Sequence, residues 1–320
     1  MVPVRVSVRG AARLDAHRPA AIGSASGVSL DSFSPGGRST GRAAPEDLSR
    51  EGGVFEGRVM DAGASVDGVF GDGVFEDGAS VDGVFEDLSP GALASATTSR
   101  PSPARFAACY AELAAAGATG IVSIHVSGEL SGTIESARAA ARGAPVPVEV
   151  IDSRSIAMGL GYPVLAAAGA ASAGGSSEEV AAAAVRRVRA TRTFFYVDTL
   201  DYLRRSGRIG TAASLVGSAL MIKPLLHLVD GRICLLEKVR TATRAIARLE
   251  DLAVRAAGEG PVEVAVQHLR AGERAEALAE RLAGRLPGPA RVRVVEVGAV
   301  IGVHVGPGML GLTLTSPALR

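Results

Sequence analysis

The sequence has few cysteines and almost no net charge, and both shortages limit what kind of protein it can be. Its 320 residues include 2 cysteines and carry a formal net charge of +1 at pH 7. Cys109 and Cys234 are far apart, on an expected helix face and an expected strand, which favours two buried reduced thiols over a disulfide framework. A balanced charge gives no global field to attract nucleic acid or an anionic membrane. We therefore expect a cytoplasmic protein that binds no nucleic acid.

The sequence also lacks a pattern typical of a membrane span. The uncharged run 155–177 consists mostly of Ala, Gly and Ser and contains Pro163, so it is typical of a buried helix. A second uncharged run, 298–319, is interrupted by glycines and by Pro307. The N-terminus carries arginines but no apolar stretch of signal-peptide length. Neither secretion nor stable membrane insertion is expected.

The first 96 residues show poor periodicity and a local duplication. The octapeptide GASVDGVF occurs at 63–70 and again at 78–85, and the stretch between Arg58 and Arg100 contains acidic residues but no basic ones. The spacing of these acids matches neither an EF-hand loop nor a calcium-binding nonapeptide repeat. A solvated acidic loop is the favoured interpretation. We expect little regular core before residue 96, and an atypical Gly/Asp-rich insert at about 52–90.

From residue 97 onward, short apolar runs alternate with helical segments, which is an α/β pattern. The apolar runs 121–126 and 146–151 each lead through a loop into a helix, from about Ile134 and about Met158. Two successive units of this kind imply parallel strands whose following loops meet at one edge of the sheet. We predict two α/β domains: 1–174 with a mainly parallel, Rossmann-like sheet, and 175–320 with a mixed sheet.

The second half contains further element signals. A capping box at Ser176 and Glu179 starts a helix, and Asp230 with Gly231 predicts a hairpin turn. Helices are expected at 211–220, 241–257 and 272–285, strands at 194–198, 262–268 and 291–297, and a last strand after residue 308. The glycine-rich segment 302–308 is interpreted as a loop.

One loop has the composition of an anion site. Segment 127–133 places serines, glycines and a threonine, among them Ser131, Gly132 and Thr133, between a strand end and a helix start. Free backbone N–H groups and the positive end of the helix dipole favour a phosphate or a carboxylate there. The loop has no lysine, which argues against a Walker-type nucleotide site. A plain glycine-rich turn with a serine cap is the alternative.

Other segments also contain polar side chains that are candidates for binding a ligand or a partner. Thr98 and Ser99 precede a helix in the same way, and either form a helix-cap cluster or lie near the same anion. His304 lies among glycines that would let the backbone approach a ligand closely, although a lone histidine is more often structural. Arg205 and Arg240 belong to basic clusters that either grip phosphate or an acidic partner, or are simply solvated.

Signatures of catalysis are missing. The sequence contains no GxSxG, no HExxH and no Cys/His cluster at zinc spacing. The match to GxGxxG at 306–311 is followed by too few residues for a dinucleotide-binding fold. We expect neither a metal nor a catalytic residue.

Several segments, taken together and in order, resemble the signatures of the DegV family. They are TSRPSP (98–103), LSGT (130–133), VIDS (150–153), DTLDYLRRSGRIG (198–210), IKP (222–224), EKVRT (237–241) and HVGPG (304–308). The resemblance covers roughly 97–320. It implies a two-domain α/β protein that holds a long-chain fatty acid in a tunnel between or beside the domains. Some members of the family present the acid to a fatty acid kinase, which makes the acyl phosphate.

The resemblance also assigns roles to individual residues. It implies that Thr98 or Ser99, together with Ser131 and His304, bind the carboxylate, while the loop glycines allow close backbone approach. Arg205 and Arg240 would face the kinase or the phosphoryl group. It further implies a carrier in phospholipid metabolism that needs no cofactor and performs no chemistry itself. The alternatives are a phosphotransferase-like enzyme related to dihydroxyacetone kinases, and a partly decayed homologue that acts as a protein-interaction scaffold.

The chain departs from the family at its N-terminus. The family opens with a strand that ends in an Asp-Ser-Thr-Ala-like motif, whereas the comparable segment 6–12 reads VSVRGAA and has neither the Asp nor the Thr. The duplicated acidic text replaces the rest of that region. We therefore expect the first strand to be altered.

Overall fold

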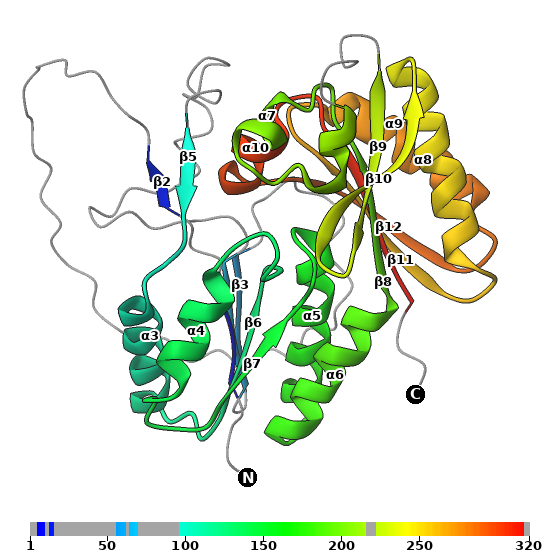
Figure 1. Cartoon of the computed structure of the whole chain (residues 1–320). Coiled ribbons are helices and arrows are strands. Elements are labelled where there is room, and N and C mark those ends of the chain that lie inside the picture. Colours follow the sequence, from blue (N-terminus) through cyan, green and yellow to red (C-terminus); the bar gives the residue numbers. More distant parts are fainter. Residues whose placement is uncertain are drawn as a thin grey trace, which may run out of the picture.

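Two β-sheets organise the chain, and each lies beside its own helices (Figure 1). The computed structural model describes residues 5–9, 13–15, 56–61, 64–69, 96–215 and 222–316. Alternation of strands and helices produces this arrangement, because each sheet face needs an apolar helix face to cover it. The predicted α/β class is confirmed.

The first sheet has 5 strands in the order β3-β4-β1-β6-β7, and four neighbours in that order run parallel: β4, β1, β6 and β7. Only the edge strand β3 is antiparallel, paired with β4. The bounds are β1 Arg5–Arg9, β3 Glu56–Asp61, β4 Ala64–Val69, β6 Ile121–His125 and β7 Val148–Asp152. The mainly parallel sheet is confirmed.

The expectation of little regular core before residue 96 is wrong for these strands. Strand β1 pairs with β6, and β4 lies inside the first copy of the duplicated octapeptide. The alternation of Arg and Ser with Val in β1 is a strand signal that the poor periodicity around it concealed. The other copy of the repeat, at 78–85, lies outside the described residues.

Helices cover both faces of the first sheet. On one face lie α3 Pro103–Ala115 and α4 Thr133–Ala141, which pack around Ile121. On the other lie α5 Met158–Ser172 and α6 Ser177–Ala190, which pack around Val122 and Ile124. The predicted capping box of α6 is present, and Ser102 caps α3. Helix α6 packs on α5 and on this first sheet, although the predicted boundary at 174/175 assigns it to the second domain. That boundary stays a prediction.

The second sheet has 6 strands in the order β10-β9-β8-β13-β11-β12. Only β11 and β12 run parallel, so the predicted mixed sheet is confirmed. The bounds are β8 Thr191–Tyr196, β9 Lys223–Val229, β10 Arg232–Val239, β11 Val262–His268, β12 Ala290–Glu296 and β13 Leu310–Thr315. Helices α8 Ala242–Ala257 and α9 Gly272–Arg285 bury one face of this sheet.

The opposite face of the second sheet packs against short helices, α7 Asp201–Arg205, the 3-10 helix η1 Gly210–Leu215 and α10 Ala299–Val305. Two expectations are corrected here. The helix predicted for 211–220 is a 3-10 turn that ends at Leu215, and 216–221 lie outside the described residues. His304 lies on α10 rather than in a loop, because burial of Ala299 and Val303 outweighs the helix-breaking glycines beside them.

A β-hairpin tip of the second sheet holds the loops of the first. Ser127 donates a hydrogen bond of 2.8 Å to the carbonyl of Gly231, at the predicted hairpin turn. Arg232 pairs with Glu129 at 2.9 Å, and Arg154 donates to Asp230 at 3.2 Å. These contacts fix the 127–133 loop against the second sheet.

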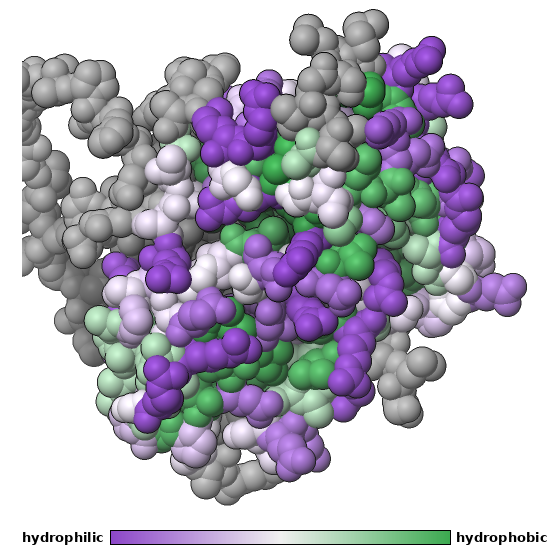
Figure 2. Space-filling view, in the orientation of Figure 1, coloured by the Kyte–Doolittle hydropathy of each residue, from purple (hydrophilic) through white to green (hydrophobic). Residues whose placement is uncertain are grey.

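The surface and the thiols agree with a globular chain. Figure 2 shows hydrophilic side chains spread over one face, with apolar ones visible between them. Among the described residues, no helix is both long and apolar enough to cross a membrane. Cys109 and Cys234 form no disulfide; Cys109 is buried as expected, whereas Cys234 is only half-buried because it lies on the strand of an exposed hairpin.

Candidate ligand-binding site

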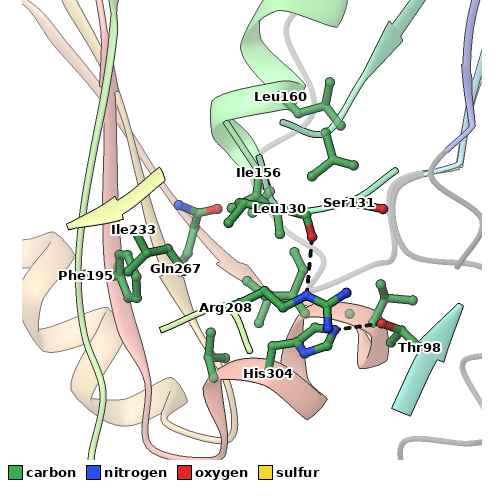
Figure 3. Close-up of a pocket in the computed structure, with 18 of the residues that line it drawn as sticks. Thr98, Leu130, Ser131, Ile156, Leu160, Phe195, Arg208, Ile233, Gln267 and His304 are labelled. Atoms are coloured by element: carbon green, nitrogen blue, oxygen red, sulfur yellow. Dashed lines mark hydrogen bonds between the residues drawn. The ribbon is translucent and has the colours of Figure 1, made fainter. Parts of the chain in front are cut away.

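A cavity of about 440 Å³ lies between the two sheets (Figure 3). Its walls come from the loops that follow β6 and β7, from the first turn of α5, from the inner face of the second sheet and from α10. This is the predicted edge of the first sheet, where the carboxyl ends of parallel strands meet. The volume lies in the range of pockets that hold small molecules.

Every predicted ligand-binding residue lines this cavity: Thr98, Ser99, Ser131, Gly132, Thr133 and His304. Thr98, on the short strand β5 Thr97–Ser99, bonds through its hydroxyl to Nε2 of His304 at 2.8 Å. Strand β5 pairs antiparallel with β2 Arg13–Asp15, which holds it in place. Two segments that are more than two hundred residues apart in the sequence thus meet at one polar end.

The loop before α4 supplies the second polar group. The hydroxyls of Ser131 and Thr133 lie 2.8 Å apart, and the Thr133 N–H donates to the Ser131 Oγ at 3.3 Å. Gly132 occupies the N-cap position of α4 without a side-chain cap. The first N–H groups of a helix favour an anion there.

Two arginines that the sequence did not single out as ligand residues complete this end. A Cβ on Gly132 would lie 2.1 Å from Nη1 of Arg100, so glycine is required for that guanidinium to lie against the start of α4. Arg208 donates from Nε to the carbonyl of Leu130 at 3.3 Å, and it also bonds to the carbonyl of Ser206. Both arginines line the cavity. The sequence signals were the place of both arginines within family motifs and, for Arg208, the basic cluster that it forms with Arg204 and Arg205.

The electrostatics keep His304 neutral. Burial, followed by the positive charges of Arg208 and Arg205, lowers the pKa of His304 from 6.5 to about 4. At neutral pH its ring therefore has one donor and one acceptor nitrogen. The polar end combines neutral hydroxyls and an imidazole with two cations, which is the chemistry of an anion site.

The rest of the cavity is largely apolar. Ile156 comes from the loop before α5, Leu160 from α5, Phe195 from β8 and Ile233 from β10 (Figure 3). Ile301 of α10 also lines the cavity. No local pattern in the sequence marks these residues as ligand contacts, since apolar residues also fill ordinary cores. An anion site at one end of an apolar cavity suits an amphipathic ligand with an acidic head.

Arg205 and Arg240 lie outside this cavity. Arg205 is exposed on α7, with its guanidinium carbon 5.0 Å from the ring centroid of Tyr202. Arg240 is exposed just after β10. Their predicted partner-facing role remains a prediction. Within the described part of the chain, no group of three or more His, Cys, Asp or Glu side chains could hold a metal ion.

Comparisons with known proteins agree with this fold and site. Residues 69–316 match the DegV family of uncharacterised proteins. A DegV domain-containing protein of Streptomyces coelicolor is 56% identical over 220 residues, which cover 69% of this chain and 78% of that relative. A solved structure of a DegV family protein from Thermus thermophilus, described as fatty acid binding, is 33% identical, with a TM-score of 0.68 and coverage of 79% of this chain and 92% of that chain.

The structure of DegV from Bacillus subtilis, described as a fatty acid binding protein, is 31% identical, with a TM-score of 0.63 and coverage of 77% of this chain and 84% of that chain. The matched residues include the second sheet, strands β6 and β7 of the first sheet, and the residues that line the cavity. This chain belongs to the DegV family.

Proposed function

We propose that the chain binds one long-chain fatty acid in this cavity, with the carboxylate at the polar end and the acyl chain against the apolar walls. The observation that carries the proposal is the arrangement of the cavity itself, in which Thr98, Ser131 and His304 meet at one end. The relatives from Thermus thermophilus and Bacillus subtilis, described as fatty acid binding, support the ligand class.

Burial of the acyl chain provides most of the affinity. About 14 methylenes at roughly 0.8 kcal/mol each give on the order of 10 kcal/mol before the costs of ordering are subtracted. The carboxylate head group then needs only hydrogen-bond donors that replace the water molecules it loses. A carboxylate can accept bonds from the hydroxyls of Thr98 and Ser131 and from the helix N–H groups, while Arg100 and Arg208 balance its charge.

The carboxylate would remain within reach of a second protein. Arg100 at the polar end is exposed, and α7 beside it presents the exposed Arg205. We place a fatty acid kinase at this surface, with Arg205 and Arg240 facing the kinase or the phosphoryl group. The chain itself acts as a cytoplasmic carrier in phospholipid metabolism and transfers no phosphate.

Trapping of acyl phosphate with hydroxylamine tests this part of the proposal. Protein loaded with palmitate should form acyl hydroxamate with ATP only when a purified fatty acid kinase is added. Arg205→Ala and Arg240→Ala should each slow this reaction while the amount of bound palmitate is unchanged, because neither residue lines the cavity. Arg186→Ala, which removes an exposed arginine from α6, is the matched control.

Two outcomes would contradict it. Acyl hydroxamate formed with ATP alone would make the chain an enzyme of the phosphotransferase kind. If Arg205→Ala and Arg240→Ala reacted as fast as Arg186→Ala, the assignment of these arginines to the kinase surface would be wrong.

A further inference from the structure

Three polar side chains, Gln267, Thr313 and Thr193, form a hydrogen-bonded band on the inner face of the second sheet, beside the apolar part of the cavity. Phe195, Gly311, Gln267 and Val295 lie in one register row across β8, β13, β11 and β12, and all four line the cavity. Gln267 is only 2% exposed. Figure 3 shows its amide apart from Thr98 and Ser131, on the other side of the cavity.

Hydrogen bonds fix the orientation of the Gln267 amide. The backbone N–H of Met158 donates to its Oε1 at 2.8 Å, and only the oxygen of an amide can accept that bond. The NH2 group must therefore point the other way, toward the Thr313 hydroxyl 2.8 Å from it. An amide rotated by half a turn would place two donors against each other.

The band continues from Thr313 to Thr193. The Thr313 oxygen accepts from Gln267, and the hydroxyls of Thr313 and Thr193 lie 3.1 Å apart, where either oxygen can be the donor. Thr193 in turn has the Ser155 hydroxyl at 3.5 Å, longer than an ordinary O–H···O bond. Both neighbours of Thr193 can donate or accept, so its own proton is not committed to either of them.

Two members of the band, Gln267 and Thr193, line the cavity. The Gln267 amide directs one N–H at Thr313, and its second N–H has no acceptor among the described residues. A plain polymethylene chain would leave that N–H facing CH2 groups, which costs free energy in a dry site. The wall therefore matches a ligand that brings an acceptor of its own.

We propose that the acyl chain held here carries an oxygen function partway along its length, a hydroxyl or a keto group, which accepts hydrogen bonds from Gln267 and Thr193. This rests on the proposed function, since the carboxylate at Thr98 and Ser131 is what places the chain beside the band. Gln267 and Thr193 are then the residues that determine specificity for oxygenated over plain fatty acids.

The test compares stearic acid with a positional series of monohydroxystearic acids on the wild-type protein. In a wholly apolar tunnel, a hydroxyl on the acyl chain weakens binding at least about tenfold, because the hydroxyl loses its hydrogen bonds to water and finds no partner in the tunnel. The proposal instead expects one position of the hydroxyl to bind as tightly as stearic acid, or about three- to tenfold tighter. If every isomer binds at least about tenfold more weakly than stearic acid, the proposal is overturned.

Variants then assign the effect to the band. Thr193→Val and Gln267→Leu should each lower the affinity for the favoured isomer relative to that for stearic acid measured on the same variant, so that the preference is lost. Thr191→Val is the matched control, because Thr191 makes the same kind of cross-strand pair, with Thr315 at 3.0 Å, but does not line the cavity. Unchanged preference in Thr193→Val would contradict the assignment even if Gln267→Leu fails to fold.

The two proposals fail in different ways. A wild-type protein that binds stearic acid but rejects every hydroxy acid remains a fatty acid carrier without the proposed specificity. A protein that binds neither contradicts the carrier function itself.

Discussion

His304 and Thr98 join α10 to β5 at the polar end, and the direction of the hydrogen bond between them depends on which ring nitrogen of His304 carries the proton. Its hydroxyl partner can donate to a carboxylate only if Nε2 keeps its proton and donates to Thr98. At neutral pH the His304 ring carries no charge, because burial and two nearby arginines lower its pKa.

Stability should therefore fall as the pH is lowered through a defined window. The pKa of His304 is 6.5 in the absence of the fold and about 4 within it, so between these values the unfolded chain holds the extra proton. Proton uptake by the unfolded state lowers the free energy of unfolding as the pH falls. Urea unfolding at a series of pH values should show a steeper loss for the wild type than for His304→Gln.

Thr98→Val is the control for this experiment, since it breaks the same hydrogen bond and keeps the histidine. Its loss of stability between pH 6.5 and about 4 should resemble that of the wild type. Equal pH dependence for wild type and His304→Gln would contradict the account of this residue.

Sequence reasoning found some residues of the site and missed others for a physical reason. Ser131 and Thr98 precede helices and carry hydroxyls, which is a local pattern. Arg100 and Gln267 come to line the cavity through neighbours that are distant in the sequence, such as Gly132 for Arg100 and Met158 for Gln267. Such contacts depend on tertiary structure and have no periodic signature.

At the scale of elements, β13 provides room for the ligand through a glycine. Gly311 lies inside the strand and lines the cavity. A Cβ there would meet Phe195 and Met309 at 3.4 Å, which is ordinary van der Waals contact. The backbone therefore does not demand glycine, and the absence of a side chain serves the cavity.

Gly311→Leu should fill part of the cavity and displace the acyl chain. The loss of about 4 buried methylenes corresponds to about 3 kcal/mol of binding free energy for palmitate. Gly311→Ala is the graded control and should bind palmitate nearly as well as the wild type. Calorimetric titration of delipidated protein measures both, and wild-type affinity in Gly311→Leu would show that the chain does not pass over β13.

Most elements were predictable because their signals are local. The capping box of α6, the N-cap of α3 and the hairpin turn at Asp230 and Gly231 all appear as expected. The misses, β1 and α10, are segments in which tertiary pairing or burial outweighs a weak local pattern. The α10 error also placed His304 on the wrong kind of element, although His304 does line the cavity.

At the scale of the molecule, the cavity exists only because two sheets face each other across it. Hydrogen bonds from Met158 to Gln267 and from Ser127 to Gly231 tie the two sheet layers together on either side. Periodicity predicted two α/β domains, the composition of loop 127–133 predicted an anion site, and the tunnel was implied by the family resemblance. A ligand that touches both layers should stabilise the whole fold in proportion to its affinity.

Native mass spectrometry of the purified protein, followed by extraction and identification of the released lipid, tests the central claim most directly. We predict one fatty acid per wild-type chain and a much lower occupancy in Ser131→Ala. Ser176→Ala should keep the lipid, because Ser176 also accepts a backbone N–H at a helix start but does not line the cavity. An empty wild-type protein that also fails to take up added oleate or palmitate would contradict the account.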